Sequence, residues 1–424
     1  MALQFIIGRS GSGKSTALYE KMIRESLDHP RQNYILIVPD QFTLDTQKEV
    51  INRHPFHGTM NIDIVSFHRL AYKVFQELSS EPGVILEDLG KSMVLSRILG
   101  EKREEMALFE GNRDKMGFID ELKSLLSEFY QYRVTKEMLL ERRDGEKKDS
   151  LLYEKLSELA LVMEEFERFM GQEYIVAEQL LTVLGERAGE SGILRDSVIC
   201  LDGFTGFTPV QYELLKKLLP ICKDMYVTVT MDEKGIGFTR ILDYELFAVS
   251  KETVSKFREI AGECQVPVLE NWVIYSEERR GGKWIRKGRF RDNPELGFLE
   301  RNLFRQRPGV YEEKTEALKV YQLADPEAEA LFAARQIGRL VREKGYRYRD
   351  IAVVSGDPER YGRRLSRVFE DYRIPCFLDD TTGMRSHPLV ECIRGLFALA
   401  EYDFHYESVC HYMKNGMSDI EKED

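Results

Sequence analysis

The chain has 424 residues, of which 61 are lysine or arginine and 72 are aspartate or glutamate, so its formal net charge is −11. This length predicts two to four domains, and the acidic balance excludes attachment to DNA or to a membrane through bulk positive charge. No run of about 18 apolar residues is present, and the first residues, MALQFIIGRS, lack the basic segment of a signal peptide. The six cysteines form no CxxC pair, which argues against a disulfide framework or a zinc or iron–sulfur site. We therefore expect a cytoplasmic protein with no membrane partner.

Short apolar runs typical of buried strands alternate with helical patterns at the beginning of the chain and return near its middle. Continuous apolar strands that alternate with helices predict an α/β domain with a parallel sheet covered on both faces. The sequence assigns residues 1–80 and 196–312 to this domain. The expected strands are 3–7, 34–38, 62–66, 198–201 and 225–229, with helices expected over 14–27 and from residue 67.

Between these two parts lies a segment with a helical pattern and no proline from residue 83 to residue 208. Apolar side chains recur at helical spacing along 118–129 and along 152–169. The segment 81–195 is interpreted as an all-helical insertion in the sheet domain. An independent helical domain with no special role explains the pattern equally well.

Residues 8–15, GRSGSGKS, fit the phosphate-binding pattern G-x-x-x-x-G-K-[ST]. The glycines let backbone N–H groups curl around phosphate oxygens, Lys14 neutralises the outer phosphates, and Ser15 offers a hydroxyl to Mg²⁺. A glycine-rich turn with a coincidental lysine is the alternative, but the strand before and the helix after the motif favour a nucleotide site. The residues expected to bind the nucleotide here are Gly8, Arg9, Ser10, Gly11, Ser12, Gly13, Lys14, Ser15 and Thr16.

A second part of this site is expected where the strand 198–201 ends at Asp202, a carboxylate that would hold Mg²⁺ together with Ser15. In helicase-type ATPases a glutamate normally follows this aspartate and polarises the attacking water, but here the next residue is Gly203. Loss of a general base typically costs ~10²–10⁴ in rate. The sequence therefore predicts a site that binds ATP with little or no hydrolysis and has no catalytic residue. The alternative is a substitute carboxylate, for which Asp40, Asp232 and Glu233 are candidates.

The last part of the chain predicts a further α/β unit. Strands are expected at 318–323, 350–355 and 374–378, and helices at 325–343, 358–372 and 387–399. Because the pattern stops at SDIEKED inside this unit, residues 313–424 are expected to be the beginning of a domain of a longer protein. The basic stretch 279–291, around Gly281 and Gly282, is expected to be an exposed loop, and its charge is typical of a solvated surface, with contact to DNA as the alternative.

Several of these motifs, in this order, resemble UvrD/Rep-type superfamily 1 helicases. The segment DGFTGFTPVQ from Asp202 resembles the DExQDxxxxQ stretch of that superfamily, while VPDQFT at 38–43 and VSFHRLAYKVF at 65–75 resemble its DNA-contacting motifs. The segment from Leu318 resembles the start of the second motor domain, with Gly356 in place of the usual phosphate-sensing arginine.

The closer resemblance, over nearly the whole chain, is to the AddB family of helicase–nuclease subunits. It implies two RecA-like domains of the P-loop NTPase fold, an inactivated helicase half, ATP and Mg²⁺ as ligands, and a heterodimer with an AddA-like helicase–nuclease subunit. It also implies processing of double-stranded DNA ends and scanning of single-stranded DNA for a Chi signal. A nuclease with an iron–sulfur cluster is implied only for the C-terminal part of the family protein, outside this chain.

Polar and aromatic residues follow three of the predicted strand ends. Ligands collect at the carboxyl edge of α/β sheets, aromatic faces stack on unpaired bases, and arginine or glutamine reads base edges. Phe67 and Tyr72 could instead be core aromatics of a helix. Together with the resemblance, the pattern indicates DNA contacts by Gln41, Thr43, Phe67, His68, Arg69, Tyr72, Phe204 and Phe207.

Three other functions remain open from the sequence. An active superfamily 1 translocase would show robust DNA-stimulated hydrolysis. A small-molecule P-loop kinase would bind a phosphate acceptor and no DNA, although the long helical segment and the second α/β unit argue against it. A purely structural partner protein would bind neither ligand.

Overall fold

The computed structural model describes residues 1–80, 83–109, 111, 115–171, 173–233, 237–238, 240–280, 283–378, 384 and 387–417. The chain divides into two compact units, Met1–Leu318 and Lys319–Asp424. The division into 1–80 with 196–312, 81–195 and 313–424 stays a prediction.

A six-stranded parallel sheet forms the centre of the first unit, with the strand order β3-β2-β6-β7-β1-β8. Strand β7 pairs with β1 on one side and with β6 on the other, so it separates the strand before the glycine-rich motif from the strand before Asp202. Because parallel strands end at the same edge, Gly8 and Asp202 lie one strand apart at the carboxyl edge. The strands are β1 (Ala2–Gly8), β2 (Tyr34–Ile37), β3 (Ile62–Val65), β6 (Val198–Leu201), β7 (Asp224–Thr230) and β8 (Trp272–Val273).

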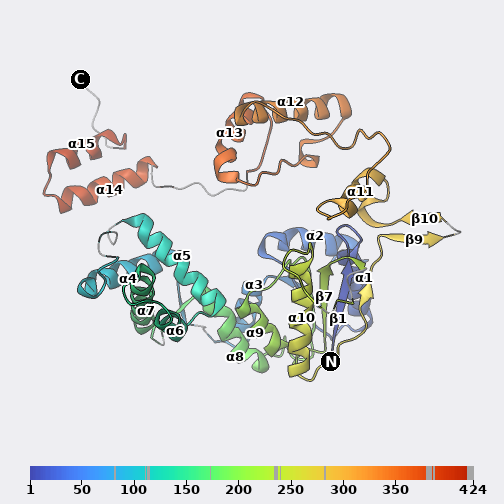
Figure 1. The fold of residues 1–424 in the computed structure, drawn as a ribbon, viewed down its shortest axis with the longest axis horizontal. Helices are drawn as coiled ribbons and strands as arrows, with labels where there is room; N and C mark the ends of the chain where they lie inside the picture. Colours follow the sequence, from blue (N-terminus) through green and yellow to red (C-terminus); the bar gives the residue numbers. More distant parts are fainter. Residues whose placement is uncertain are drawn as a thin grey trace. The chain divides into compact units, whose positions relative to one another are not determined.

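Both faces of this sheet are covered by helices, as continuous apolar strands require (Figure 1). Successive side chains of a strand point to opposite faces, so Phe5 and Ile7 enter one core while Ile6 enters the other. Burial of each such side chain contributes ~1.5–3 kcal/mol. One face packs on α1 (Lys14–Asp28) and α2 (Thr43–Arg53), and the other on α3 (Phe67–Glu77), α8 (Leu180–Arg187), α9 (Pro209–Leu218) and α10 (Ala248–Glu263).

The helical segment between β3 and β6 has a hydrophobic core of its own, in which Leu95, Leu122 and Phe166 are buried. The two segments with apolar side chains at helical spacing, 118–129 and 152–169, lie on two of its helices, α5 and α7. Two short parallel strands that the sequence did not predict pair with each other where the chain enters and leaves this segment. Its elements are β4 (Val84–Leu86), α4 (Asp88–Glu101), α5 (Met116–Tyr132), α6 (Lys136–Asp144), α7 (Leu151–Met170) and β5 (Tyr174–Val176).

The basic stretch differs from the expected loop. It contains an antiparallel pair, β9 (Glu277–Arg280) and β10 (Lys283–Arg286), in which Lys283 lies opposite Arg280 and Trp284 opposite Arg279. Gly281 and Gly282 lie outside the described residues. A short 3₁₀ turn, η7 (Gly288–Phe290), and helix α11 (Pro294–Asn302) follow.

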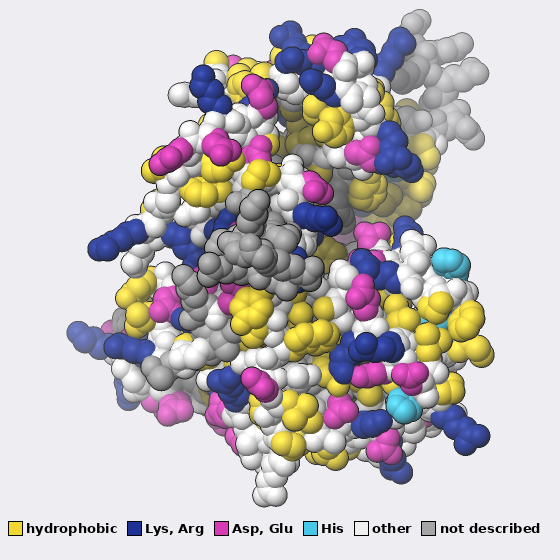
Figure 2. Space-filling view, turned by 90° about the vertical axis from the view of Figure 1, so that its right-hand side faces the viewer, with side chains coloured by type: hydrophobic (Ala, Val, Ile, Leu, Met, Phe, Trp, Pro, Cys, Tyr) yellow, Lys and Arg dark blue, Asp and Glu magenta, His cyan; other side chains and the backbone are white. Residues whose placement is uncertain are grey.

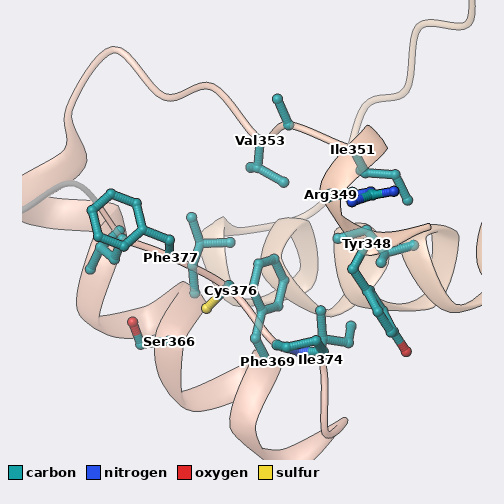
Figure 3. Close-up of a pocket in the computed structure, with 14 residues that line it drawn as sticks. Tyr348, Arg349, Ile351, Val353, Ser366, Phe369, Ile374, Cys376 and Phe377 are labelled. Carbon is teal, nitrogen blue, oxygen red and sulfur yellow. The ribbon is translucent and has the colours of Figure 1, made fainter. Parts of the chain in front are cut away.

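In the second unit the predicted helices are confirmed as α12 (Pro326–Lys344), α13 (Pro358–Asp371) and α14 (Pro388–Glu401), with α15 (Tyr406–Lys414) after them. The predicted strands 318–323, 350–355 and 374–378 form no paired strand in the described part of the chain, and Asp350 belongs to a short 3₁₀ turn. A strand exists only through hydrogen bonds to a neighbour, and an apolar pattern alone does not supply one. Two of these segments line an apolar pocket of about 640 Å³ against Leu365 and Phe369 of α13 (Figure 3).

Within the described residues, no helix combines the length and the apolar character needed to cross a lipid bilayer.

Candidate nucleotide site and nucleic-acid surface

The glycine-rich loop links the end of β1 at Gly8 to the start of α1 at Lys14. Gly13 occupies the N-cap position of α1 in the left-handed region (φ 100°). Among the described residues no side chain makes a capping hydrogen bond to α1, and the first turn of this helix contains no acidic residue. The first N–H groups of α1 and the positive end of its dipole are therefore available to an anion. Ser12 adds a buried hydroxyl whose oxygen has no hydrogen-bond partner among the described residues. These features fit a phosphate group.

Lys14 is buried at the start of α1, and its Nζ donates a hydrogen bond to the Arg9 carbonyl oxygen (2.9 Å). Burial lowers the pKa of Lys14 to about 8, although Asp202 and Glu300 attract its charged form. Ser10, in the loop, is exposed, and Thr16, in the first turn of α1, accepts a hydrogen bond from Arg53 (3.4 Å).

Asp202 follows β6 and is buried beside the loop. Its Oδ1 accepts hydrogen bonds from Ser15 Oγ (3.0 Å) and Thr228 Oγ1 (2.6 Å), and its Oδ2 accepts one from the Tyr19 hydroxyl (2.6 Å). Burial and the neighbouring Asp202 raise the pKa of Tyr19, so this hydroxyl stays protonated and donates. The structure thus brings together Lys14, Ser15 and Asp202, the residues expected to hold a nucleotide and its magnesium ion.

Sequence reasoning missed Tyr19 and Thr228. Tyr19 lies one helical turn after Ser15, so the spacing on α1 contained a usable signal. Thr228 belongs to β7, and its proximity to Asp202 depends on β7 lying between β1 and β6, which no local pattern in the sequence reveals.

Gly203 occupies the position after the aspartate in a left-handed conformation, with φ 80°. Its nearest neighbours in the space that a side chain would enter are Pro39 and Phe42, on the connection from β2 to α2. L-residues rarely adopt this conformation. A glutamate at this position would therefore hold a strained backbone conformation.

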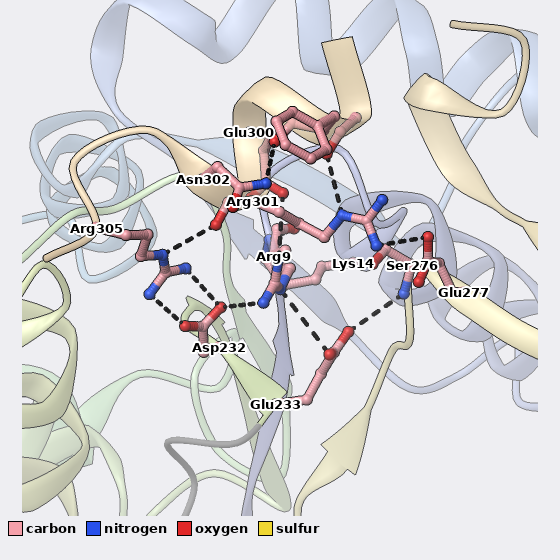
Figure 4. Close-up of polar contacts among 12 residues, drawn as sticks. Arg9, Lys14, Asp232, Glu233, Ser276, Glu277, Glu300, Arg301, Asn302 and Arg305 are labelled. Atoms are coloured by element: carbon pink, nitrogen blue, oxygen red, sulfur yellow. Dashed lines mark hydrogen bonds and ion pairs between the residues drawn. The ribbon is translucent and has the colours of Figure 1, made fainter. Parts of the chain in front are cut away.

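Each of the three carboxylates that could substitute for the glutamate lies beside an arginine or histidine side chain. Asp232 pairs with Arg9 (2.9 Å) and Arg305, and Glu233 lies 3.9 Å from Arg9 (Figure 4). Asp40 is exposed and lies 3.7 Å from the His68 ring nitrogen. No observed contact favours any of them as a general base.

The residues expected to contact DNA follow β2, β3 and β6, which are adjacent in the sheet. Gln41, His68, Arg69 and Tyr72 are exposed, whereas Thr43 is buried and donates to the Asp40 carbonyl oxygen (2.9 Å). On the face seen in Figure 2, acidic and basic side chains are interspersed.

The three phenylalanines of this group pack against one another. Phe67 is 4 % exposed, its ring centroid lies 5.5 Å from that of Phe204, and Phe204 stacks on Phe207 at 4.8 Å. Phe67 is thus a core aromatic in this structure, the alternative that the sequence left open. Phe42, which sequence reasoning did not select, is 47 % exposed beside Gly203.

Together, the fold and the site define a class: a parallel α/β protein in which a glycine-rich loop, a lysine and an aspartate meet at the carboxyl edge of the sheet. Comparison with known proteins is more specific. The family model described as ADDB, N-terminal, matches residues 5–300. Proteins named as the B component of an ATP-dependent helicase/deoxyribonuclease are similar over the whole chain. The one from Lachnoclostridium phytofermentans is 38 % identical over 420 residues, or 99 % of this chain and 36 % of that protein.

The similarity extends to proteins of the same name from two other bacteria. The one from Desulforudis audaxviator is 35 % identical over 430 residues, and the one from Clostridium tetani is 33 % identical over 431 residues. These alignments cover 100 % of this chain and 36 % of each relative. The chain belongs to the AddB family. It spans about 36 % of the length of these curated relatives.

Proposed function

We propose that this chain is the helicase-like part of an AddB-type protein, with two RecA-like domains of the P-loop NTPase fold. It binds ATP and Mg²⁺ with little or no hydrolysis and holds single-stranded DNA at the carboxyl edge of its sheet. The observation that carries the proposal is the meeting of Lys14, Ser15 and Asp202 at one edge while Gly203 takes the place of the general base.

In this proposal the glycine-rich loop and the beginning of α1 bind the phosphates, and Lys14 neutralises the outer ones. Ser15 and Asp202 would hold the Mg²⁺ ion, while Tyr19 and Thr228 fix the carboxylate through their hydrogen bonds. Bound Mg²⁺ would neutralise phosphate charge. Because Gly203 cannot activate water and Asp40, Asp232 and Glu233 lie against other side chains, the site would retain the triphosphate.

The DNA partner and the protein partner are inferred from the family. Single-stranded DNA would lie across Gln41, Arg69 and Tyr72, so that the chain can inspect it for a Chi-type signal. The assembly would be a heterodimer with an AddA-like subunit that processes double-stranded ends for recombination in the cytoplasm. We assign the nuclease and its iron–sulfur cluster to the part of the relatives' sequences that this chain does not cover.

Titration with a fluorescent ATP analogue and Mg²⁺ tests the nucleotide site. Wild-type protein should bind the analogue, and Lys14→Ala should lose at least tenfold in affinity, because a charge-assisted contact to phosphate is removed. Lys21→Ala, on the same helix but paired with Glu25, is the matched control and should bind normally. Equal, weak binding by wild type and Lys14→Ala would mean that the loop is not used for nucleotide.

A further inference from the structure

Arg9, in the glycine-rich loop, directs its side chain into a cluster of carboxylates (Figure 4). Its Nη2 lies 2.9 Å from Asp232, its Nη1 3.7 Å from Glu300 and its Nε 3.9 Å from Glu233. Asp232 and Glu233 follow β7, whereas Glu300 belongs to α11. Ion pairs through Arg9 therefore join the loop to two elements far away in the sequence.

Further ion pairs hold α11 itself and the chain that follows it. After the helix, Arg305 contacts both oxygens of Asp232 (2.9 and 2.6 Å). Within it, Arg301 pairs with Glu277 at the start of β9 (2.7 Å). The chain that continues to Lys319 is thus anchored to the end of β7, through the carboxylate that Arg9 also contacts.

The turn before α11 rests directly on the glycine-rich loop. The Arg289 backbone N–H donates to the Gly11 carbonyl oxygen (2.8 Å), and a side chain at Gly288 would collide with that same carbonyl group. A side chain at Gly11 would press on Arg289 and Phe290. We call residues 288–305 the covering segment, because they lie on the loop and are held there by Glu300 and Arg305.

The contacts of Arg9 are incomplete, which argues against a purely structural role. In the described part of the chain, its Nε and Nη1 atoms are buried without a hydrogen-bond partner. Burial also raises the pKa of Glu300 despite the nearby arginine. Buried charges with unsatisfied atoms contribute little to stability and often reduce it. Two of the three ion pairs are long, so a small movement of the loop can shorten or break them.

We propose that Arg9 is a positioning residue that couples ligand occupancy of the glycine-rich loop to the seating of the covering segment. The inference rests on the proposed function, in that the ligand is the phosphate chain of a nucleotide. A nucleotide that orders the loop stabilises the seated segment, and the seated segment raises nucleotide affinity by the same factor, because coupling between two sites is reciprocal. Nucleotide binding would thereby change how firmly the chain leading to Lys319 is held against the first unit.

Neutralising Glu300 or Asp232 separates this coupling from simple electrostatics. Glu300 also favours the charged form of Lys14, so the comparison is made at about pH 6.5, where Lys14 stays charged. If the cluster acted only through its charge, Glu300→Gln and Asp232→Asn would then bind a polyanionic nucleotide more tightly, because a negative charge near the site is removed. If the seated segment is needed, both variants bind more weakly. The two explanations predict opposite signs.

The first experiment measures the affinity for a fluorescent ATP analogue with Mg²⁺. We expect affinity to fall about fivefold or more in Glu300→Gln, Asp232→Asn and Arg9→Met, with Arg9→Lys in between because it retains the charge but not the planar fork. Asp292→Asn, on the exposed part of the same segment, removes the same charge outside the cluster and should bind at least as well as wild type. Unchanged or tighter binding by Glu300→Gln and Asp232→Asn would overturn the inference.

The second experiment measures hydrogen exchange of residues 288–305. Without nucleotide, exchange should be faster in Arg9→Met and Glu300→Gln than in wild type, at an unchanged melting temperature. Nucleotide should slow this exchange in wild type and much less in the variants. If wild type binds no nucleotide, the proposed function fails, but the ligand-free comparison still decides whether Arg9 seats the segment. Equal exchange in wild type and Arg9→Met would refute the coupling.

Discussion

The backbone at Gly203 bears directly on whether hydrolysis can be restored. With φ 80° at this residue, a glutamate would add strain of about 1–3 kcal/mol. We expect Gly203→Glu to be less stable than wild type in chemical denaturation and to hydrolyse ATP no faster. Gly203→Ala should show a similar loss of stability, which separates backbone strain from charge. A stable Gly203→Glu variant with strong turnover would contradict this explanation.

The depressed pKa of Lys14 predicts a pH dependence of nucleotide binding. Burial places this pKa at about 8 in the ligand-free protein, so Lys14 loses its charge as the pH rises through that value. Phosphate binds the charged form, and above pH 8 binding must take up a proton. Affinity for the ATP analogue should therefore be level below about pH 7.5 and fall progressively between about pH 8 and 9.5. Lys14→Ala should lack this fall, and the same profile in wild type and variant would assign it to another group.

At the scale of the element, helix α3 places one of the predicted DNA-contacting residues in the core and another at the surface. Phe67 is buried on its inner face, whereas Arg69 is exposed at the sheet edge. Phe67→Ala should lower the free energy of unfolding by ~3–5 kcal/mol. Arg69→Ala should leave stability within ~0.5 kcal/mol and weaken binding of a single-stranded oligonucleotide. Fluorescence anisotropy and denaturation measured on both variants check this. Arg69→Ala with wild-type DNA affinity would remove α3 from the proposed interface.

The central sheet could be predicted from the sequence because its strands are continuous apolar runs. The predicted strand 198–201 coincides with β6, and the run 3–7 lies inside β1. The same pattern failed in the second unit, where Val353 and Val354 belong to no paired strand among the described residues. An apolar run shows that a segment is suited to a buried sheet, whereas a strand also requires a neighbouring strand to which it can form hydrogen bonds. The β9–β10 pair was missed for the converse reason, since its charged residues lack an apolar pattern.

At the scale of the whole molecule, residues with a fixed spacing in the chain were predictable and those that meet only through the fold were not. The loop from Gly8 to Ser15 could be identified from its spacing, and Asp202 from its place after an apolar strand. Thr228 and the cluster around Arg9 depend on the order of the strands and on the return of α11 to the loop. The exposure of Phe42 likewise follows from packing and not from residue type.

The central claim is that this chain binds a triphosphate and lacks the carboxylate needed to hydrolyse it. The most direct measurement is steady-state ATP turnover at saturating ATP and Mg²⁺, with and without single-stranded DNA, on preparations whose nucleotide binding has been verified. We predict that wild type binds the nucleotide, that its turnover is negligible and barely changed by DNA, and that this turnover is no higher than the background of Lys14→Ala. Robust DNA-stimulated turnover in wild type that is lost in Lys14→Ala would contradict it.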